Sequence, residues 1–353
     1  MAVEQQPHPE NIHIPWQQKN QQENSHKPAP QQTPQPAVGQ PFIYHIPVEE
    51  RTLAYHRLSH ADPRTRWWSP LAEGLLGGLF YLGFSIALGI AFASILGPQN
   101  ITLNLQSLQS LTLKDPLIFA LVFGSIALLY PSMFLARLVT GPKPWGLVHS
   151  VYGKIRWSWM GFCFAIAIIG YIVLPMLINA LGESVQAPDV ESPGKNFVWL
   201  LLLIFTITPI QCYAEELVFR GYLMQTLGRW IRNPIIVITL PAVLFMFGHA
   251  YDFWAQMSVL TMGLAAGFMT WKTGGLEAGI ALHVVNNLWV MFMGSLGIAD
   301  PFAQQGSTAG DFLGTLIIQL IIVLIVILSA RKMGIHNTQT FSVAMTHGKS
   351  IPR

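Results

Sequence analysis

The sequence has few charged residues. Of its 353 residues only 10% are Asp, Glu, Lys or Arg, whereas 52% are hydrophobic and the mean hydropathy is +0.43. This composition is too apolar for an ordinary soluble domain, so we expect an integral membrane protein. The net charge of +3 is small and the basic residues form no stripe, which argues against a nucleic-acid-binding protein.

Cysteines are also scarce. The only two, Cys163 and Cys212, lie within apolar segments, so they provide neither a disulfide framework nor a thiolate metal site. The first fifty residues contain no apolar core of a secretory signal peptide. We therefore expect the first membrane helix to act as the insertion signal.

The chain divides into three regions by composition. Residues 1–68 are rich in Gln and Pro up to Pro47 and show no helical or strand period, which predicts a disordered cytosolic tail. Residues 69–332 are expected to form an all-α, polytopic transmembrane bundle, and residues 333–353 a short cytosolic tail. Apolar runs near the length needed to cross a bilayer predict eight helices, at 71–97, 116–139, 157–181, 197–228, 234–250, 255–271, 275–297 and 311–330.

Lys and Arg residues gather in alternate loops, as expected for cytoplasmic flanks. One set of flanks carries Arg51, Arg57, Arg64, Arg66, Arg137, Lys143, Lys154, Arg156, Arg229, Arg232, Lys272, Arg331 and Lys332. The opposite loops carry only Lys114 and Lys195, beside seven carboxylates. Both termini are therefore predicted to be cytoplasmic, which requires an even number of crossings.

Ionisable side chains inside membrane segments are costly, so they are candidates for function. Glu215, Glu216 and Arg220 follow one another in a helical pattern. Glu216 and Arg220 are spaced i, i+4 and can neutralise each other, whereas Glu215 points about 100° away. A plain stabilising ion pair would explain Glu216 and Arg220 but not Glu215.

Two further polar groups interrupt the apolar runs: His249 ends one run, and His283 lies one turn before Asn287 in another. The turn at Arg232 lies about 17 residues from both Glu215 and His249, so a helical hairpin would bring these two to the same depth. Asn286 is a less well aligned alternative to Asn287.

One acid, two imidazoles and an amide suit the attack of water on a peptide bond. Glu215 would take a proton from water, His249 would orient the water and protonate the leaving amine, and His283 and Asn287 would donate to the oxyanion. The same side chains, Glu215, His249 and His283, could also bind a divalent metal such as zinc. The His-Glu-x-x-His, Gly-x-Ser-Gly and paired aspartyl-protease motifs are absent.

Three ordered motifs resemble those of the CAAX protease and bacteriocin-processing family. They are Glu215-Glu216-x-x-x-Arg220, Phe245-x-x-x-His249 and His283-x-x-x-Asn287, within a core of about 195–295. The resemblance implies an intramembrane endopeptidase, with 69–332 as its protease domain, Glu216, Arg220 and Phe245 as supporting residues, and metal dependence left open. It implies a bilayer and a peptide or protein substrate as partners, and we expect a bacterial cytoplasmic membrane.

Two other classes of protein remain open on the sequence. A non-catalytic immunity or scaffold protein would use the polar cluster to bind a peptide partner. A proton-coupled transporter would use it as a relay, although the first three spans contain no matching polar cluster.

The predicted depths of the site residues disagree. Counted along the helix from the turn at Arg232, Glu215 should lie about 25 Å into the membrane. Counted from the turn at Gly274, His283 should lie only about 13 Å into it. We expect residues 218–236 to project beyond the bilayer as a hairpin, with Gln225 accessible from the cytosol.

Overall fold

The structure is a computed structural model that describes residues 48–62, 65–96, 115–140, 145–181, 195–298 and 306–344. The described residues all belong to one compact unit, which spans residues 46–353. Most of the expected disordered tail, residues 1–47, lies outside the described residues, as does the C-terminal segment from residue 345.

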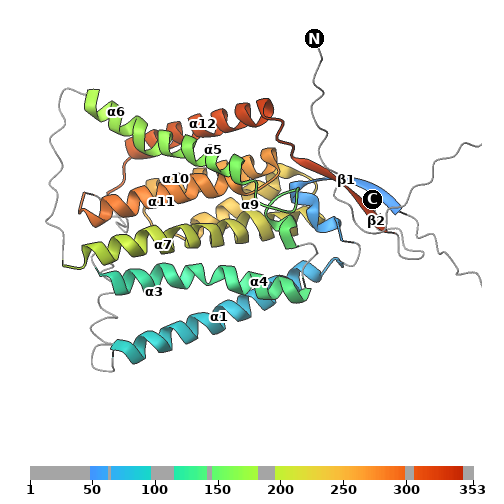
Figure 1. The fold of residues 1–353 in the computed structure, drawn as a ribbon, viewed down its shortest axis with the longest axis horizontal. Coiled ribbons are helices and arrows are strands. Elements are labelled where there is room, and N and C mark those ends of the chain that lie inside the picture. Colours follow the sequence, from blue (N-terminus) through green and yellow to red (C-terminus); the bar gives the residue numbers. More distant parts are fainter. Residues whose placement is uncertain are drawn as a thin grey trace, which may run out of the picture. The chain divides into compact units, whose positions relative to one another are not determined.

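All eight predicted apolar segments are helical, and Figure 1 shows the long helices running side by side. The helices are α1 (Ser69–Leu96), α3 (Pro116–Ala127), α4 (Leu129–Thr140), α5 (Trp157–Ile168), α6 (Leu174–Leu181), α7 (Phe197–Glu216), α8 (Met224–Trp230), α9 (Pro234–Phe247), α10 (Phe253–Thr273), α11 (Glu277–Ser295) and α12 (Ala309–Lys332). Two π-helical turns, η3 (Ile169–Val173) and η4 (Leu217–Leu223), join α5 to α6 and α7 to α8.

The fold is a polytopic membrane bundle, as predicted. Within the described residues, six helical segments are long and apolar enough to cross a bilayer. The remaining two predicted segments form α9, which has 14 residues, and α10, which has 21 residues and is less hydrophobic. Large apolar side chains such as Leu75 and Leu79 on α1 point outward, where lipid would cover them.

Several helix ends follow from local sequence. Asp115, Asn233 and Asp252 each accept a backbone hydrogen bond at the start of α3, α9 and α10. Thr308 and Asp311 form a capping box at the start of α12. These side chains satisfy backbone N–H groups that a helix start otherwise leaves free, which fixes where each helix begins.

Residues 48–62 are ordered, which corrects our prediction of a disordered tail up to residue 68. They form β1 (Val48–Ala54) and the short 3₁₀ helix η1 (Tyr55–His60), and we call them the N-terminal strap. β1 pairs antiparallel with β2 (Thr338–Ala344), which lies in the predicted C-terminal tail. The prediction failed because this pairing joins the two ends of the chain and has no helical period.

The N-terminal strap is held against α8. Tyr55 is fully buried and its hydroxyl donates to the carbonyl of Val148 at 2.5 Å. The Arg57 guanidinium donates to the carbonyl of Gly228 at 2.6 Å. A Cβ added at Gly228 would lie 1.7 Å from the carbonyl oxygen of His56, so the strap can pack here only because residue 228 has no side chain.

Gly228→Ala is therefore expected to push the N-terminal strap away from α8 and to destabilise the protein. Overpacking of this kind costs about 1–3 kcal/mol, and the loss should appear as a lower Tm of the purified protein in detergent. Gly83→Ala on α1 is the matched control, because a Cβ there meets no atom within 4 Å. An equal Tm for both variants would show that the strap contact is not formed.

The turn between α10 and α11 is buried within the protein. Gly274 has φ of +70° and its carbonyl accepts from Val151 at 2.8 Å, while the carbonyl of His149 accepts from Leu276 at 2.9 Å. Because residues 145–156 cover this turn, α11 begins well inside the protein. Gln225 is also buried and donates to the carbonyl of Leu147, so the expectation of an accessible Gln225 was wrong.

Candidate active site

The two neighbouring acids of α7 have different surroundings. Glu216 is fully buried, and its Oε1 accepts from Arg220 Nη1 at 2.8 Å, as the i, i+4 spacing predicts. Glu215 is nine-tenths buried, and its Oε2 makes no hydrogen bond. Glu216 is therefore held in an ion pair with Arg220, whereas Glu215 faces His283; the Oε2 atom of each acid makes no hydrogen bond.

His283 on α11 links these two acids. Its Nδ1 donates to Glu216 Oε1 at 2.9 Å, and its Nε2 lies 3.5 Å from Glu215 Oε2. The same Nε2 accepts from the side-chain amide of Asn287 at 3.2 Å. Both ring nitrogens of His283 thus face protein groups, which differs from the free oxyanion donor that the sequence suggested.

His249 follows the C-terminal end of α9 and is held by Phe245. Its Nδ1 lies 2.9 Å from the carbonyl oxygen of Phe245, which can only accept, so Nδ1 carries the proton and Nε2 keeps a lone pair. The Phe245 ring also packs against His249, with centroids 4.8 Å apart and the ring planes tilted by 60°, and meets His283 edge-on at 5.5 Å. The Arg220 guanidinium lies 4.4 Å from the Phe245 ring centroid. Phe245 therefore packs against three of the polar motif residues.

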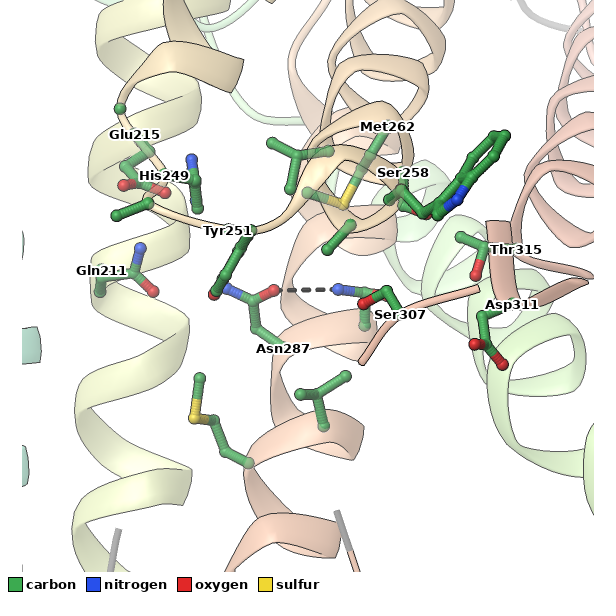
Figure 2. A pocket seen from close by; sticks show the side chains of 18 of the residues that line it. Gln211, Glu215, His249, Tyr251, Ser258, Met262, Asn287, Ser307, Asp311 and Thr315 are labelled. Atoms are coloured by element: carbon green, nitrogen blue, oxygen red, sulfur yellow. Dashed lines mark hydrogen bonds between the residues drawn. The ribbon is translucent and has the colours of Figure 1, made fainter. Parts of the chain in front are cut away.

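A cavity of about 480 Å³ adjoins this cluster. Figure 2 shows Glu215, His249 and Asn287 among the side chains that line it, together with Asp311 from the start of α12. His283 does not line the cavity; it lies behind Glu215 and Asn287. The three motif helices thus present an acid, an imidazole and an amide to one space.

Asn286 and Asn287 of α11 both line the cavity, but their side chains make different hydrogen bonds. Asn286 Nδ2 donates to Asn287 Oδ1 at 3.0 Å, which fixes the orientation of the Asn287 amide. With one Asn287 N–H directed at His283, the second remains for another acceptor. Asn287 is therefore the better placed donor, as the helical phase indicates.

The side chains do not fit a metal ion as they are arranged. Across the part of the chain that the structure describes, no three or more His, Cys, Asp or Glu side chains converge on one point. For Glu215, His249 and His283 the reason is local, because His283 directs Nδ1 at Glu216 and Nε2 at the amide of Asn287. We derive no catalytic step through a metal.

Sequence reasoning did not single out Gln211, which lines the cavity, or the acid at the start of α11. Gln211 lies one helical turn before Glu215, is buried, and lines the cavity. Glu277, at the start of α11, forms a buried ion pair with Arg156, with Nη2 and Oε2 2.7 Å apart. Glu277 is an ionisable group inside a predicted span, so the rule that identified Glu215 could also have found it.

These features define a class: a polytopic helical membrane protein with an acid, imidazole and amide site inside the bundle. The family model described as type II CAAX prenyl endopeptidase Rce1-like matches residues 194–289, which contain all three motifs. The uncharacterized protein YyaK of Bacillus subtilis (strain 168) is 30% identical over 240 residues, covering 64% of this chain and 77% of YyaK. No solved structure matches.

The chain belongs to the Rce1-like family of type II CAAX prenyl endopeptidases. The resemblance drawn from the three motifs is therefore confirmed at the level of the family. Membership in a membrane-embedded protease family implies a lipid bilayer and a peptide or protein substrate.

Proposed function

We propose that this protein is an intramembrane endopeptidase that hydrolyses a peptide bond of a membrane-associated protein or peptide. Its catalytic domain would be residues 69–332. The observation that carries the proposal is that Glu215, His249 and Asn287 line one cavity. Buried ionisable side chains that share a cavity are costly to keep for stability alone, so their retention points to a chemical role.

Water is the nucleophile in this proposal. The Glu215 carboxylate accepts a proton from a water molecule in the cavity, while the lone pair of His249 Nε2 accepts the second water hydrogen and orients the attack. Transfer of the first proton to the leaving amine then completes cleavage of the peptide bond. The carbonyl of Phe245 keeps His249 in the tautomer that this step requires.

Asn287 supplies the oxyanion donor. Its second N–H, the one not directed at His283, donates to the carbonyl oxygen as negative charge develops there. His283 acts as a positioning residue, since it connects the Glu216–Arg220 pair to Glu215 and Asn287. This modifies the role of His283 that we expected from sequence.

We also propose that the basic end of the bundle faces the cytosol of a bacterial cell. In the described residues, Arg57, Arg229 and Arg232 lie at the end that carries the N-terminal strap. The positive-inside rule then places both termini in the cytoplasm.

A comparison of membrane peptides tests the proposed function. Cells with the wild-type protein are compared by mass spectrometry with cells that carry Glu215→Ala at the same abundance. At least one membrane-associated protein should accumulate uncut in the variant, with the cleaved fragments present only in the wild type. Identical peptide sets, together with an intact biological phenotype, would favour a non-catalytic binding protein.

Asn287→Ala is expected to lower kcat by about 10²–10³, because the variant lacks the donor aimed at the developing oxyanion. The matched control is Asn286→Ala, which removes a neighbouring amide from the cavity wall and its hydrogen bond to Asn287 but leaves the Asn287 donor in place. We expect this control to stay within about tenfold of wild type, since Asn287 keeps its bond to His283. Cleavage rates of the identified substrate measure both, and equal losses would remove Asn287 from the oxyanion site.

A further inference from the structure

A groove on the outer surface of the bundle shares no residue with the cavity of the candidate active site. It has a volume of about 410 Å³ and is lined by α9, α10 and α12, of which α10 packs against both of the others. Ile235 on α9 and Leu320 on α12 have exposed fractions of 69% and 58%, so this lining faces outward. On a membrane bundle the space is therefore open to lipid. We call it the α10 groove.

The lining of the α10 groove suits a hydrocarbon chain. Eight of its eleven side chains are apolar, and Thr261 and Gln319 direct their donors at the carbonyl of Ser258, at 3.0 and 3.4 Å. A peptide backbone in the groove would find few partners for its N–H and C=O groups, which is costly away from water. A hydrocarbon chain has no such groups.

The α10 groove also has the length of one membrane leaflet. Thr261 is the lining residue of α10 farthest from the basic end, and it precedes Lys272 by eleven residues, which is about 16 Å along the helix axis. Half of the hydrocarbon core of a bilayer is about 15 Å thick. A chain that begins at the basic end would therefore extend along the groove to the middle of the membrane.

Cations gather at the basic end of the three helices that line the groove. Arg232 precedes α9, Lys272 lies in the last turn of α10, and Arg331 and Lys332 lie in the last turn of α12. Within the described residues, none of these four side chains forms a salt bridge. Each helix of the groove thus carries uncompensated positive charge at this end.

Contacts show that the ends of α10 and α12 meet and that one cation reaches the groove. A Cβ added at Gly274, just after α10, would lie 2.7 Å from the carbonyl oxygen of His336, which follows α12. Lys272 Nζ lies 4.2 Å from the ring centroid of Trp271 and 5.8 Å from that of Phe268. Because Phe268 lines the groove, the Lys272 ammonium group lies at its mouth.

We propose that the α10 groove binds one anionic phospholipid, with an acyl chain along α10 and the phosphate beside Lys272. Charge complementarity selects the head group and its position. At the other end of the same helices, Asp252 caps the start of α10 and Asp311 lies in the first turn of α12, and both would repel a phosphate. The lipid therefore binds with its head group at the basic end, which is the cytoplasmic leaflet in the orientation proposed above.

Native mass spectrometry of the purified full-length protein in detergent tests this site. The protein is titrated with phosphatidylglycerol and with zwitterionic phosphatidylcholine of the same acyl chains, and the Kd of the first bound lipid is measured. The wild type should bind phosphatidylglycerol at least about fivefold more tightly, which is the contribution of one basic residue near an anionic head group. Equal affinities for the two lipids would overturn the proposal.

Lys272→Gln should weaken the binding of phosphatidylglycerol about fivefold and leave that of phosphatidylcholine unchanged, because only the charge at the head group is removed. The matched control is Lys154→Gln, which removes an exposed cation from residues 145–156, outside the helices of the groove. This control should bind both lipids as the wild type does. An equal loss in the two variants would show a general attraction to the basic end and overturn the assignment of Lys272.

Ala265→Phe places a ring in the α10 groove and should remove the tight first site for both lipids. The matched control is Leu79→Phe, which puts the same ring on the outward face of α1 and should leave both affinities unchanged. Unchanged binding in Ala265→Phe would overturn the site for the acyl chain. If the Tm shows that Ala265→Phe does not fold, the result for Lys272→Gln decides the proposal alone.

A lipidated substrate is the competing occupant of the groove. An S-farnesylated peptide is therefore titrated under the same conditions. Loss of its binding in Ala265→Phe, with the binding of phosphatidylglycerol retained, would assign the groove to a substrate and overturn the proposal. Because no cleavage is measured, failure of the lipid site and failure of the proposed protease activity are separate results.

Discussion

Glu215→Gln is expected to lower the cleavage rate at least about a thousandfold. The amide has the size of the carboxylate but cannot accept a proton from water, and general base catalysis contributes about 10²–10⁴ to rates of this kind. The protein should still fold, because Glu215 Oε2 makes no hydrogen bond that the substitution would break. Single-turnover cleavage of the substrate found by the peptide comparison measures the loss.

Two controls define what this result means. Glu50→Gln removes an exposed carboxylate from β1 and should cleave at the wild-type rate. The Tm of Glu215→Gln should match that of the wild type or exceed it, since an uncharged amide replaces a buried carboxylate whose Oε2 makes no hydrogen bond. A variant that retains more than about a tenth of the wild-type rate would exclude Glu215 as the base.

Glu216→Gln is expected to lower the stability of the protein, and its main effect should be on folding and not on the cleavage step. The Glu216 and Arg220 side chains are 1% and 2% exposed, so the substitution leaves the Arg220 guanidinium buried without its counter-ion. Breaking a buried ion pair from one side costs about 3–5 kcal/mol, because the remaining charge is uncompensated. Yield in the membrane and Tm in detergent should both fall.

The double variant Glu216→Gln, Arg220→Met separates charge from packing. Removing both charges together is often nearly neutral, and the side-chain carbonyl of the introduced glutamine can still accept from His283 Nδ1. We expect this variant to recover most of the lost Tm. An unchanged Tm in Glu216→Gln, accompanied by loss of cleavage, would instead show that Glu216 takes part in the reaction.

Glu215 and Glu216 are neighbours in the sequence, but we assign the first to catalysis and the second to an ion pair. The sequence predicted the ion pair but not the full set of contacts. The i, i+4 spacing identified the partner of Glu216, because residues one turn apart on a helix are neighbours whatever surrounds them. No local rule indicated that His283 would bond Glu216 with one nitrogen and face Glu215 with the other. That arrangement depends on how α11 packs against α7.

The prediction that the N-terminal strap is disordered failed for the same reason, because its structure depends on contacts between distant segments. β1 pairs with β2 across the whole length of the chain, so neither segment shows the pairing in its own composition. The burial of the α10–α11 turn could not be predicted from the sequence either. It depends on residues 145–156, which cover the turn and precede it by more than a hundred positions.

By itself the sequence determined that this protein is a membrane bundle of about eight helical segments. It also determined where several helices begin, and which motif side chains share a helical face. Hydrophobic length, capping side chains and helical period act over a few residues, so they can be recognised without a fold. Only the tertiary structure decided which oxygen of Glu215 faces His283, and that the residues carrying the acid, imidazole and amide adjoin one cavity. These features depend on contacts between distant segments, which packing alone sets.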